Sequence, residues 1–536
     1  MHLSKLTIAN HSRLEDTELE VRRHLVLVGP NDVGKSSVLR CLNLLLGASA
    51  AQLYSWVSPD DLRDQTRPLV IEAVLVDFTA NEEASFPDEI NVGADGGKSL
   101  TLRLEATFDQ NGTLLVERRA QGAGHNRQVS RQQLEAIGWK LLGATASGRD
   151  LRDDRRSTLD EILEQVELGS EQADFDALAT KLQEQIEGSA VLGSLRGELA
   201  GQLSKALPDP IERDDLRLVP GSTADSDVLS DVRLQVVKAG VPHNLSEQSD
   251  GMRALYALAL YDLVSIGANI VGIDEPEVHL HPTSQRSLAR LLQSAPNQKI
   301  LATHSPDIVG AFSPDCIVAV RGRGRVVQPS ANFLTNDERM VVHWWVRDKL
   351  EPLTARRVIA VEGVSDRIIM EAVGDLTGRN LDRLGVSLVE TDGAGDMGAI
   401  IKLFGEHGFD IPMSLLIDRD AAPATSEKLE VPEAALAGHS VHISDPDLEA
   451  EYVNALGADV VWSAIEASPL FTSNERQNCQ ASGPGGTRTA EDVAAFCRRK
   501  GKGYKVRAAM VVVPLLTAAT AKTIASINRL LDEITA

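Results

Sequence analysis

The chain has 536 residues, of which 43% are hydrophobic and 24% charged, and its formal net charge at pH 7 is -23. This composition is typical of a globular protein with roughly two to four domains, and it excludes a protein coated in positive charge. A local basic groove for DNA remains compatible with the acidic total, whereas aromatic residues, at 4%, are too sparse for binding dominated by base stacking.

Cysteine usage and hydropathy indicate the compartment. The four cysteines, Cys41, Cys316, Cys479 and Cys497, form no C-x-x-C pair and no zinc spacing, so we expect free thiols in a reducing environment. The N-terminus lacks the apolar segment of a signal peptide, and the longest apolar stretch, residues 508–519, is too short to span a bilayer. A cytoplasmic protein without a membrane partner is therefore expected.

The first predicted elements surround a glycine-rich loop. Residues 3–8 alternate like an edge strand. The apolar run Leu25–Val28 then leads into Gly29–Ser37, and a helical pattern follows over residues 38–45. The spacing G-x-x-x-x-G-K-[ST] between a strand and a helix predicts a P-loop.

The chemistry of this loop is that of phosphate binding. Two glycines turn backbone N–H groups inward around a phosphate, at the positive end of the following helix. Lys35 suits the β- and γ-phosphates, and the Ser36 hydroxyl suits Mg²⁺. The predicted ATP contacts in this segment are Asn31, Gly34, Lys35, Ser36 and Ser37.

The next part of the chain changes from strands to helices. Strand patterns at residues 69–78, 100–104 and 113–116 predict an antiparallel sheet beside the nucleotide-binding core. From about residue 157 to 207, apolar residues recur at helical spacing among acidic and amide side chains. This segment carries no catalytic constellation, and we interpret it as an inserted helical arm for dimerisation or scaffolding.

Further nucleotide-site residues follow a strand predicted at residues 232–237. Ser249 and Gly251 open an apolar helix and form a candidate anion site, although serines at such positions commonly only cap helices. An apolar strand then ends in Asp274-Glu275, as in a Walker B motif. We expect Asp274 to hold Mg²⁺ and Glu275 to orient and deprotonate the attacking water.

Histidines follow the Walker B motif. His304 ends the next buried strand, a position that suits a γ-phosphate sensor. His279 and His281 have two interpretations, either a metal-binding pair or residues that pack and position a dimer loop.

These segments together resemble the ATP-binding set of the ABC/SMC-type ATPases. The resemblance rests on Gly29–Ser37, Leu245–Arg253, Asp274–Glu277 and Thr303–Ser305. In that class, the signature segment of one subunit completes the nucleotide site of another. The resemblance implies that ATP lies between two heads, with Ser249 and Gly251 acting in trans, although the segment departs from the wording L-S-G-G-Q.

A second α/β unit is predicted after residue 352. Two of its predicted strands end in acidic residues, namely Glu362 and Asp366 after residues 357–361, and Asp418 and Asp420 after residues 413–417. Carboxylates at the C-terminal ends of parallel strands can converge on a divalent ion. Oxygen ligands without His or Cys indicate Mg²⁺ or Mn²⁺, and such ions suit phosphodiester cleavage.

The pattern E-G-x-x-D followed by D-x-D resembles the Toprim module of topoisomerases, primases and some nucleases. Beyond it, Glu449 is a candidate further ligand, preferred to Glu451, with a solvated helix face as the alternative for both. Residues 498–507 are the densest basic run of the chain and suit the DNA backbone, the alternative being a solvated loop. Lys505, with Lys502 close behind, is our candidate to stabilise charge at the scissile phosphate or to act as a base there.

An ABC-type ATPase followed by a Toprim domain resembles the OLD (overcoming lysogenisation defect) family of ATP-dependent endonucleases. The resemblance implies an α/β chain with an ATPase head in two parts, residues 1–152 and 213–345, a helical dimerisation insertion at 153–212, and a Toprim nuclease domain over 346–536. It also implies ATP hydrolysis, Mg²⁺ or Mn²⁺ at both sites, DNA as substrate, a homodimer or larger assembly, and roles in phage defence or DNA repair. It does not say whether a helicase partner exists.

Two functions are compatible with these motifs. The first is an ATP-controlled endonuclease whose metal site uses Glu362, Asp366, Asp418 and Asp420. The second is an SMC-like ATPase clamp on DNA whose Toprim domain is not catalytic. Four acids at these spacings favour the nuclease, and no tyrosine stands in a context that would indicate a topoisomerase.

Overall fold

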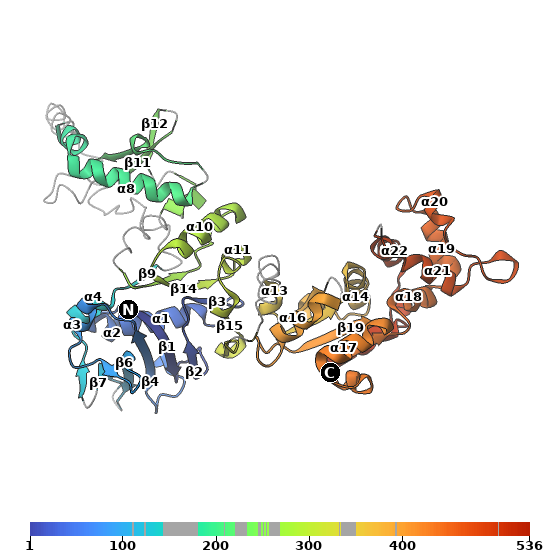
Figure 1. Cartoon of the computed structure of the whole chain (residues 1–536), viewed down its shortest axis with the longest axis horizontal. Coiled ribbons are helices and arrows are strands. Elements are labelled where there is room, and N and C mark those ends of the chain that lie inside the picture. The colour runs from blue at the N-terminus through green and yellow to red at the C-terminus, as the bar shows by residue number, and fades with distance from the viewer. Residues whose placement is uncertain are drawn as a thin grey trace. The chain divides into compact units, whose positions relative to one another are not determined.

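The computed structural model describes the chain except for residues 110–111, 123–124, 143–180, 208, 220–232, 239, 245–247, 250, 253–254, 257–267, 332, 334–349, 392–393, 502 and 536. The chain divides near residue 328 into two compact units, with Met1–Val327 in the first and Lys349–Ala536 in the second (Figure 1). Much of the helical arm predicted from residue 157 lies outside the described residues. The domain boundaries remain a prediction.

An antiparallel sheet forms one layer of the first unit, as predicted. Its strands lie in the order β2-β1-β4-β6-β7-β8, with β5 paired to β6. Their bounds are β1 (His2–Ala9), β2 (Thr17–Glu20), β4 (Leu69–Val76), β5 (Asn91–Val92), β6 (Lys98–Phe108), β7 (Leu114–Gly122) and β8 (His125–Gln128). The prediction of an edge strand at residues 3–8 was wrong, because β1 pairs with both β2 and β4. An interior antiparallel strand with one buried face shows the same alternation.

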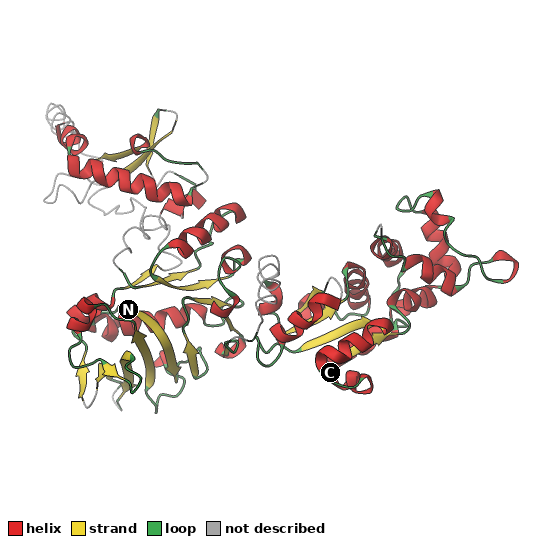
Figure 2. Ribbon diagram, in the orientation of Figure 1, coloured by secondary structure: helices red, strands yellow, loops and turns green. Residues whose placement is uncertain are grey.

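A second sheet carries the P-loop. Its order is β16-β15-β3-β14-β13-β9, and all neighbours are parallel except β15 and β16. The strands are β3 (Leu25–Val28), β9 (Trp139–Leu142), β13 (Ile270–Asp274), β14 (Gln298–Thr303), β15 (Ile317–Val320) and β16 (Val326–Val327). Helix α1 (Lys35–Leu46) contacts strands of both sheets, and Figure 2 shows the helices and strands of this unit together. The apolar face of α1 joins the hydrophobic core that it shares with these strands. The parallel strands therefore present their carboxyl ends, where ligands bind in such sheets, at one edge.

The described part of the first unit also contains further helices and a small separate sheet. The helices are α2 (Ala50–Trp56), α3 (Ala80–Ser85), α4 (Arg131–Ile137), α8 (Ala190–Ala206), α10 (Pro282–Ser294) and α11 (Pro306–Val309). The strands β10 (Leu216–Val219), β11 (Arg233–Lys238) and β12 (Val241–Asn244) form a three-stranded antiparallel sheet. Helix α8 lies within the predicted insertion at 153–212, and it packs against β10 and α10, which follow the insertion in the chain.

The second unit contains a four-stranded parallel sheet in the order β18-β17-β19-β20, formed by β17 (Arg357–Val361), β18 (Val386–Glu390), β19 (Met413–Asp418) and β20 (Val441–Ser444). The helices beside it are α13 (Glu351–Thr354), α14 (Val364–Leu376), α15 (Leu381–Leu384), α16 (Ala394–Phe404), α17 (Ala422–Leu429) and α24 (Ala525–Thr535). A helical part follows, with α18 (Leu448–Leu456), α19 (Ala458–Ala467), α20 (Ser473–Arg476), α21 (Ala490–Cys497), α22 (Tyr504–Val512) and α23 (Ala518–Ala521). Strands β17 and β19 are neighbours, so the acids that follow them meet at one sheet edge.

Two expectations from composition can be compared with the structure. All four cysteines are free and buried. Within the described residues, no helix combines the length and apolar character that a bilayer crossing requires.

Candidate functional site

The P-loop folds around the side chain of Lys35. Gly34 has φ of 114°, a conformation that glycine adopts without strain. The Lys35 ammonium donates to the carbonyl oxygens of Gly29 at 3.1 Å and of Pro30 at 2.9 Å. Burial lowers the pKa of Lys35, although nearby carboxylates, first among them Glu275, oppose this. The cation is therefore fixed at the start of α1, where phosphate is expected.

The Walker B acid lies beside the first turn of α1. The Ser36 hydroxyl donates to the Asp274 carboxylate at 2.9 Å. Burial raises the pKa of Asp274, and the charge of Glu275 adds to the rise. A hydroxyl and a carboxylate at this separation are suited to share one Mg²⁺. Asn31 is exposed on the loop, and Ser37 is half-buried in the first turn of α1.

Glu275 and His304 meet at the carboxyl edge of the same sheet. The His304 Nε2 atom lies 3.0 Å from Glu275 Oε1 and 2.6 Å from Lys35 Nζ, and Lys35 Nζ lies 3.7 Å from Glu275 Oε1. Burial alone would raise the pKa of Glu275, but the hydrogen bond and charge of His304, together with Lys35, lower it. Glu275 is therefore held as a carboxylate beside the two other residues predicted to act at the γ-phosphate.

The predicted signature residues are exposed or half-buried. The Ser249 hydroxyl accepts from the Met252 N–H at 3.5 Å, as a capping residue does. A Cβ on Gly251 would come within 2.6 Å of the His279 carbonyl oxygen, so this site accepts only glycine without a backbone shift. His281 caps α10 through Nδ1. Neither His279 nor His281 joins a group of three metal-ligand side chains within the described residues.

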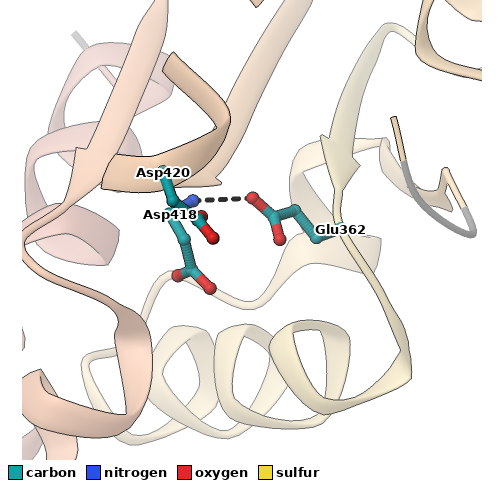
Figure 3. Close-up of side chains that lie close together, drawn as sticks. All are labelled: Glu362, Asp418 and Asp420. Atoms are coloured by element: carbon teal, nitrogen blue, oxygen red, sulfur yellow. Dashed lines mark hydrogen bonds between the residues drawn. The ribbon is translucent and has the colours of Figure 1, made fainter. Parts of the chain in front are cut away.

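The second unit gathers three of its four predicted acids. Glu362, Asp418 and Asp420 each offer a carboxylate oxygen within 4.8 Å of the others (Figure 3). The Asp418 N–H donates to Glu362 Oε1 at 2.8 Å, which aligns the ends of β17 and β19. Burial raises the pKa of Glu362, and Asp418 adds to the rise. Such clustered carboxylates fit a divalent cation, which would favour their charged forms.

Asp366 lies beside this cluster without joining it. The Asp366 carboxylate accepts the Gly363 N–H at 2.9 Å in the first turn of α14. Burial, and then the charge of Asp418, raise the pKa of Asp366 to about 7. The charge of the cluster therefore affects the pKa of Asp366, and the hydrogen bond of Asp366 stabilises the turn after β17.

A lysine and a further acid complete the site. The Lys505 ammonium donates to Asp418 Oδ2 at 3.1 Å and lies 3.6 Å from Glu449 Oε2. Burial raises the pKa of Glu449 to about 7, against the opposing effect of Lys505. Burial alone would lower the pKa of Lys505, but Glu449 and Asp418 raise it. Lys505 is therefore a fixed cation at the cluster, and Lys502 lies outside the described residues.

The basic run is largely held by ion pairs. Arg498 pairs with Asp447 at 2.9 Å and with Glu491 at 3.0 Å, and Arg507 pairs with Glu475 at 3.2 Å. The interpretation as a loop was wrong from Tyr504 onward, because α22 begins there. Exposed Arg499 and Lys500 remain the described members of the run best placed for a DNA backbone.

Residues that hold the site side chains in place were not predicted from the sequence, and the structure shows them in both units. Asp447 caps α18, and the neighbouring Leu448 N–H donates to Asp418 Oδ1 at 3.1 Å, which fixes that carboxylate. Glu277, also missed as a site residue, accepts from the Thr303 hydroxyl at 2.8 Å and from the His304 N–H. Its position two residues after Glu275 was the available signal.

Glu449 and Glu451 provide a matched pair for testing. Glu449→Gln should reduce DNA cleavage by about 10-fold or more, because it removes a charge beside Asp418 and Lys505. Glu451→Gln should instead lower Tm and leave cleavage per folded molecule nearly unchanged, because Glu451 Oε2 accepts from the Ser526 N–H and hydroxyl. Plasmid nicking and thermal melting measure the two effects. Equal cleavage losses in both variants would contradict the assignment of Glu449.

Comparisons with known proteins match both parts of the chain. Residues 25–310 match the family described as "AAA domain, putative AbiEii toxin, Type IV TA system", and residues 353–420 match "Overcoming lysogenization defect protein-like, TOPRIM domain". The OLD nuclease of Thermus scotoductus is 24% identical over 84% of this chain and 91% of its own length. Endonuclease GajA of Bacillus cereus is 20% identical over 73% of this chain and 71% of its own length.

A solved structure is also similar in part. The SMC head bound to the C-winged helix domain of ScpA aligns with a TM-score of 0.42 and 16% identity, and it covers 64% of this chain and all of that one.

Proposed function

Because this chain belongs to the family of AAA-domain ATPases and, through its OLD-like Toprim domain, to the OLD family of nucleases, we propose that it is an ATP-hydrolysing, divalent-metal-dependent DNA endonuclease. The proposal includes control of cleavage by ATP and a role in phage defence or DNA repair.

The observation that carries the proposal is the acid cluster with its lysine. Glu362, Asp418 and Asp420 would hold Mg²⁺ or Mn²⁺, which supplies Lewis acidity to a phosphodiester and lowers the pKa of a bound water. Lys505, held by Asp418 at 3.1 Å, can stabilise the charge that develops on the phosphate. Four charged side chains arranged in this way support a catalytic Toprim domain over a merely DNA-binding one.

The ATPase side of the proposal rests on the first unit. Lys35 would contact the β- and γ-phosphates, Ser36 and Asp274 would hold Mg²⁺, and Glu275 would orient the attacking water. A homodimer places Ser249 and Gly251 of one chain at the nucleotide of the other. Free, buried cysteines agree with a reducing compartment such as the cytoplasm.

Cleavage of supercoiled plasmid tests the proposal directly. The protein should nick or linearise the plasmid with Mg²⁺ or Mn²⁺, and excess EDTA should stop the reaction because the acid cluster then lacks its cation. Reactions with and without ATP show whether ATP increases or decreases the rate of cleavage. Absence of cleavage with either metal, under every nucleotide condition, would overturn the nuclease function and leave an ATPase that binds DNA.

A further inference from the structure

A closed ring of hydrogen bonds joins the segment after the Walker B acids to the segment that carries His304. The Thr303 hydroxyl donates to Glu277 Oε2 at 2.8 Å and accepts from the Ser305 N–H at 3.0 Å. The Ser305 hydroxyl donates to Gln285 Oε1 at 2.6 Å, and Gln285 Nε2 donates to the Leu280 carbonyl at 2.9 Å. The Leu280 N–H closes the ring by donating to the Glu277 carbonyl at 2.9 Å.

Glu277 is the point where this ring meets the catalytic residues. Its second carboxylate oxygen, Oε1, accepts from the His304 N–H, so both oxygens hold the end of β14. On the other side of the site, the Glu275 N–H donates to the Ala302 carbonyl at 2.8 Å. Hydrogen bonds thus fix the backbones of both Glu275 and His304. Their side chains meet between the two backbones, with His304 Nε2 3.0 Å from Glu275 Oε1.

We propose that Glu277 and Thr303 are positioning residues for ATP hydrolysis, which hold His304 in register with Glu275 and Lys35. The inference rests on the proposed ATPase function, and it concerns the chemical step rather than nucleotide binding. Neither residue is placed at the P-loop, where Lys35 and Ser36 would contact phosphate and Mg²⁺.

Burial makes the ring sensitive to the loss of one hydroxyl. Thr303 is fully buried, so removing its hydroxyl leaves a Glu277 oxygen and the Ser305 N–H without that partner. Valine has nearly the same shape as threonine, so Thr303→Val removes the bonds while it keeps the packing of β14. Serine keeps the hydroxyl, so Thr303→Ser restores the bonds at the expense of one methyl group.

The test compares Thr303→Val, Thr303→Ser and Glu277→Gln in the full-length protein. We expect kcat for ATP hydrolysis to fall by about 10- to 100-fold in Thr303→Val and Glu277→Gln, the range that a misplacement of about 1 Å produces. The Kd for a non-hydrolysable ATP analogue should stay within about 3-fold of wild type, since the P-loop contacts are unchanged. Thr303→Ser should retain most of the wild-type kcat.

Controls separate positioning from folding and from the function itself. Ser287→Ala removes a hydroxyl on α10 whose hydrogen bond, among the described residues, goes to the Thr283 carbonyl of the same helix, and it should leave kcat unchanged. Lys35→Ala should be inactive and serves as the control for the ATPase function. With that control inactive, a wild-type kcat in Thr303→Val would overturn the inference. A loss of kcat in Thr303→Ser equal to that in Thr303→Val would overturn it as well. If Thr303→Val does not fold, Glu277→Gln decides, and wild-type turnover there would overturn the inference. A wild-type protein without ATPase activity would instead refute the proposed function.

Discussion

Replacing Lys35 with alanine should abolish ATP hydrolysis, with a loss of at least about 100-fold in kcat/KM, or about 3 kcal/mol of transition-state stabilisation. The Lys35 ammonium is buried among the Gly29 and Pro30 carbonyls, His304 and Glu275, so the substitution removes the cation that these contacts hold in place. ATP affinity should fall as well, because the lysine contacts phosphate in the ground state. Steady-state phosphate release and equilibrium nucleotide binding measure the two losses.

Glu275→Gln distinguishes a catalytic defect from a binding defect at the same site. The amide keeps the size of the carboxylate but cannot accept a proton from water, so turnover should be lost while ATP remains bound. The variant also loses the ion pair of Glu275 with His304 and Lys35. Hydrolysis near the wild-type rate in both Lys35→Ala and Glu275→Gln would contradict the site described for this unit.

The grouping of the motif residues in the first unit could be expected from the sequence, because these residues stand in short motifs. Lys35 and Ser36 follow Gly34 directly, and Asp274 and Glu275 end one strand, so local spacing fixes their geometry once the parallel sheet forms. His304 was predicted from its place at the end of a buried strand, by the same reasoning. The pairing of Glu277 with Thr303 spans 26 residues and depends on the register of β13 and β14, which a single sequence does not reveal.

The acid cluster of the second unit could be expected in outline from the sequence, and its details depend on tertiary contacts. Strand ends place Glu362 and Asp418 together, whereas Asp366 accepts from the Gly363 N–H in the first turn of α14 and is not part of the trio. Lys505 reaches Asp418 from a helix 87 residues further along the chain. The edge-strand error at β1 has a related cause, since alternation reports one buried face and says nothing of how many neighbours a strand has.

Replacing Asp418 with asparagine should abolish DNA cleavage, with a loss of at least about 100-fold in rate, while ATP hydrolysis continues. Asp418 lies at the centre of the site, because it accepts from the Leu448 N–H and the Lys505 ammonium and shares the cluster with Glu362 and Asp420. An asparagine keeps one acceptor oxygen but turns an NH₂ group toward a donor, and it removes a charge that would hold the proposed divalent cation.

The matched control for this change is Asp445→Asn. Asp445 follows β20 at the same edge of the sheet, but it is exposed and pairs only with Arg419 in the described structure, so cleavage should stay near wild type. Plasmid nicking at several Mg²⁺ and Mn²⁺ concentrations measures both variants, and phosphate release confirms that the ATPase is intact. Cleavage by Asp418→Asn at the wild-type rate would place the nuclease chemistry elsewhere in the chain. Equal losses in both variants would instead indicate that negative charge at this edge, rather than a ligand position, is what cleavage requires.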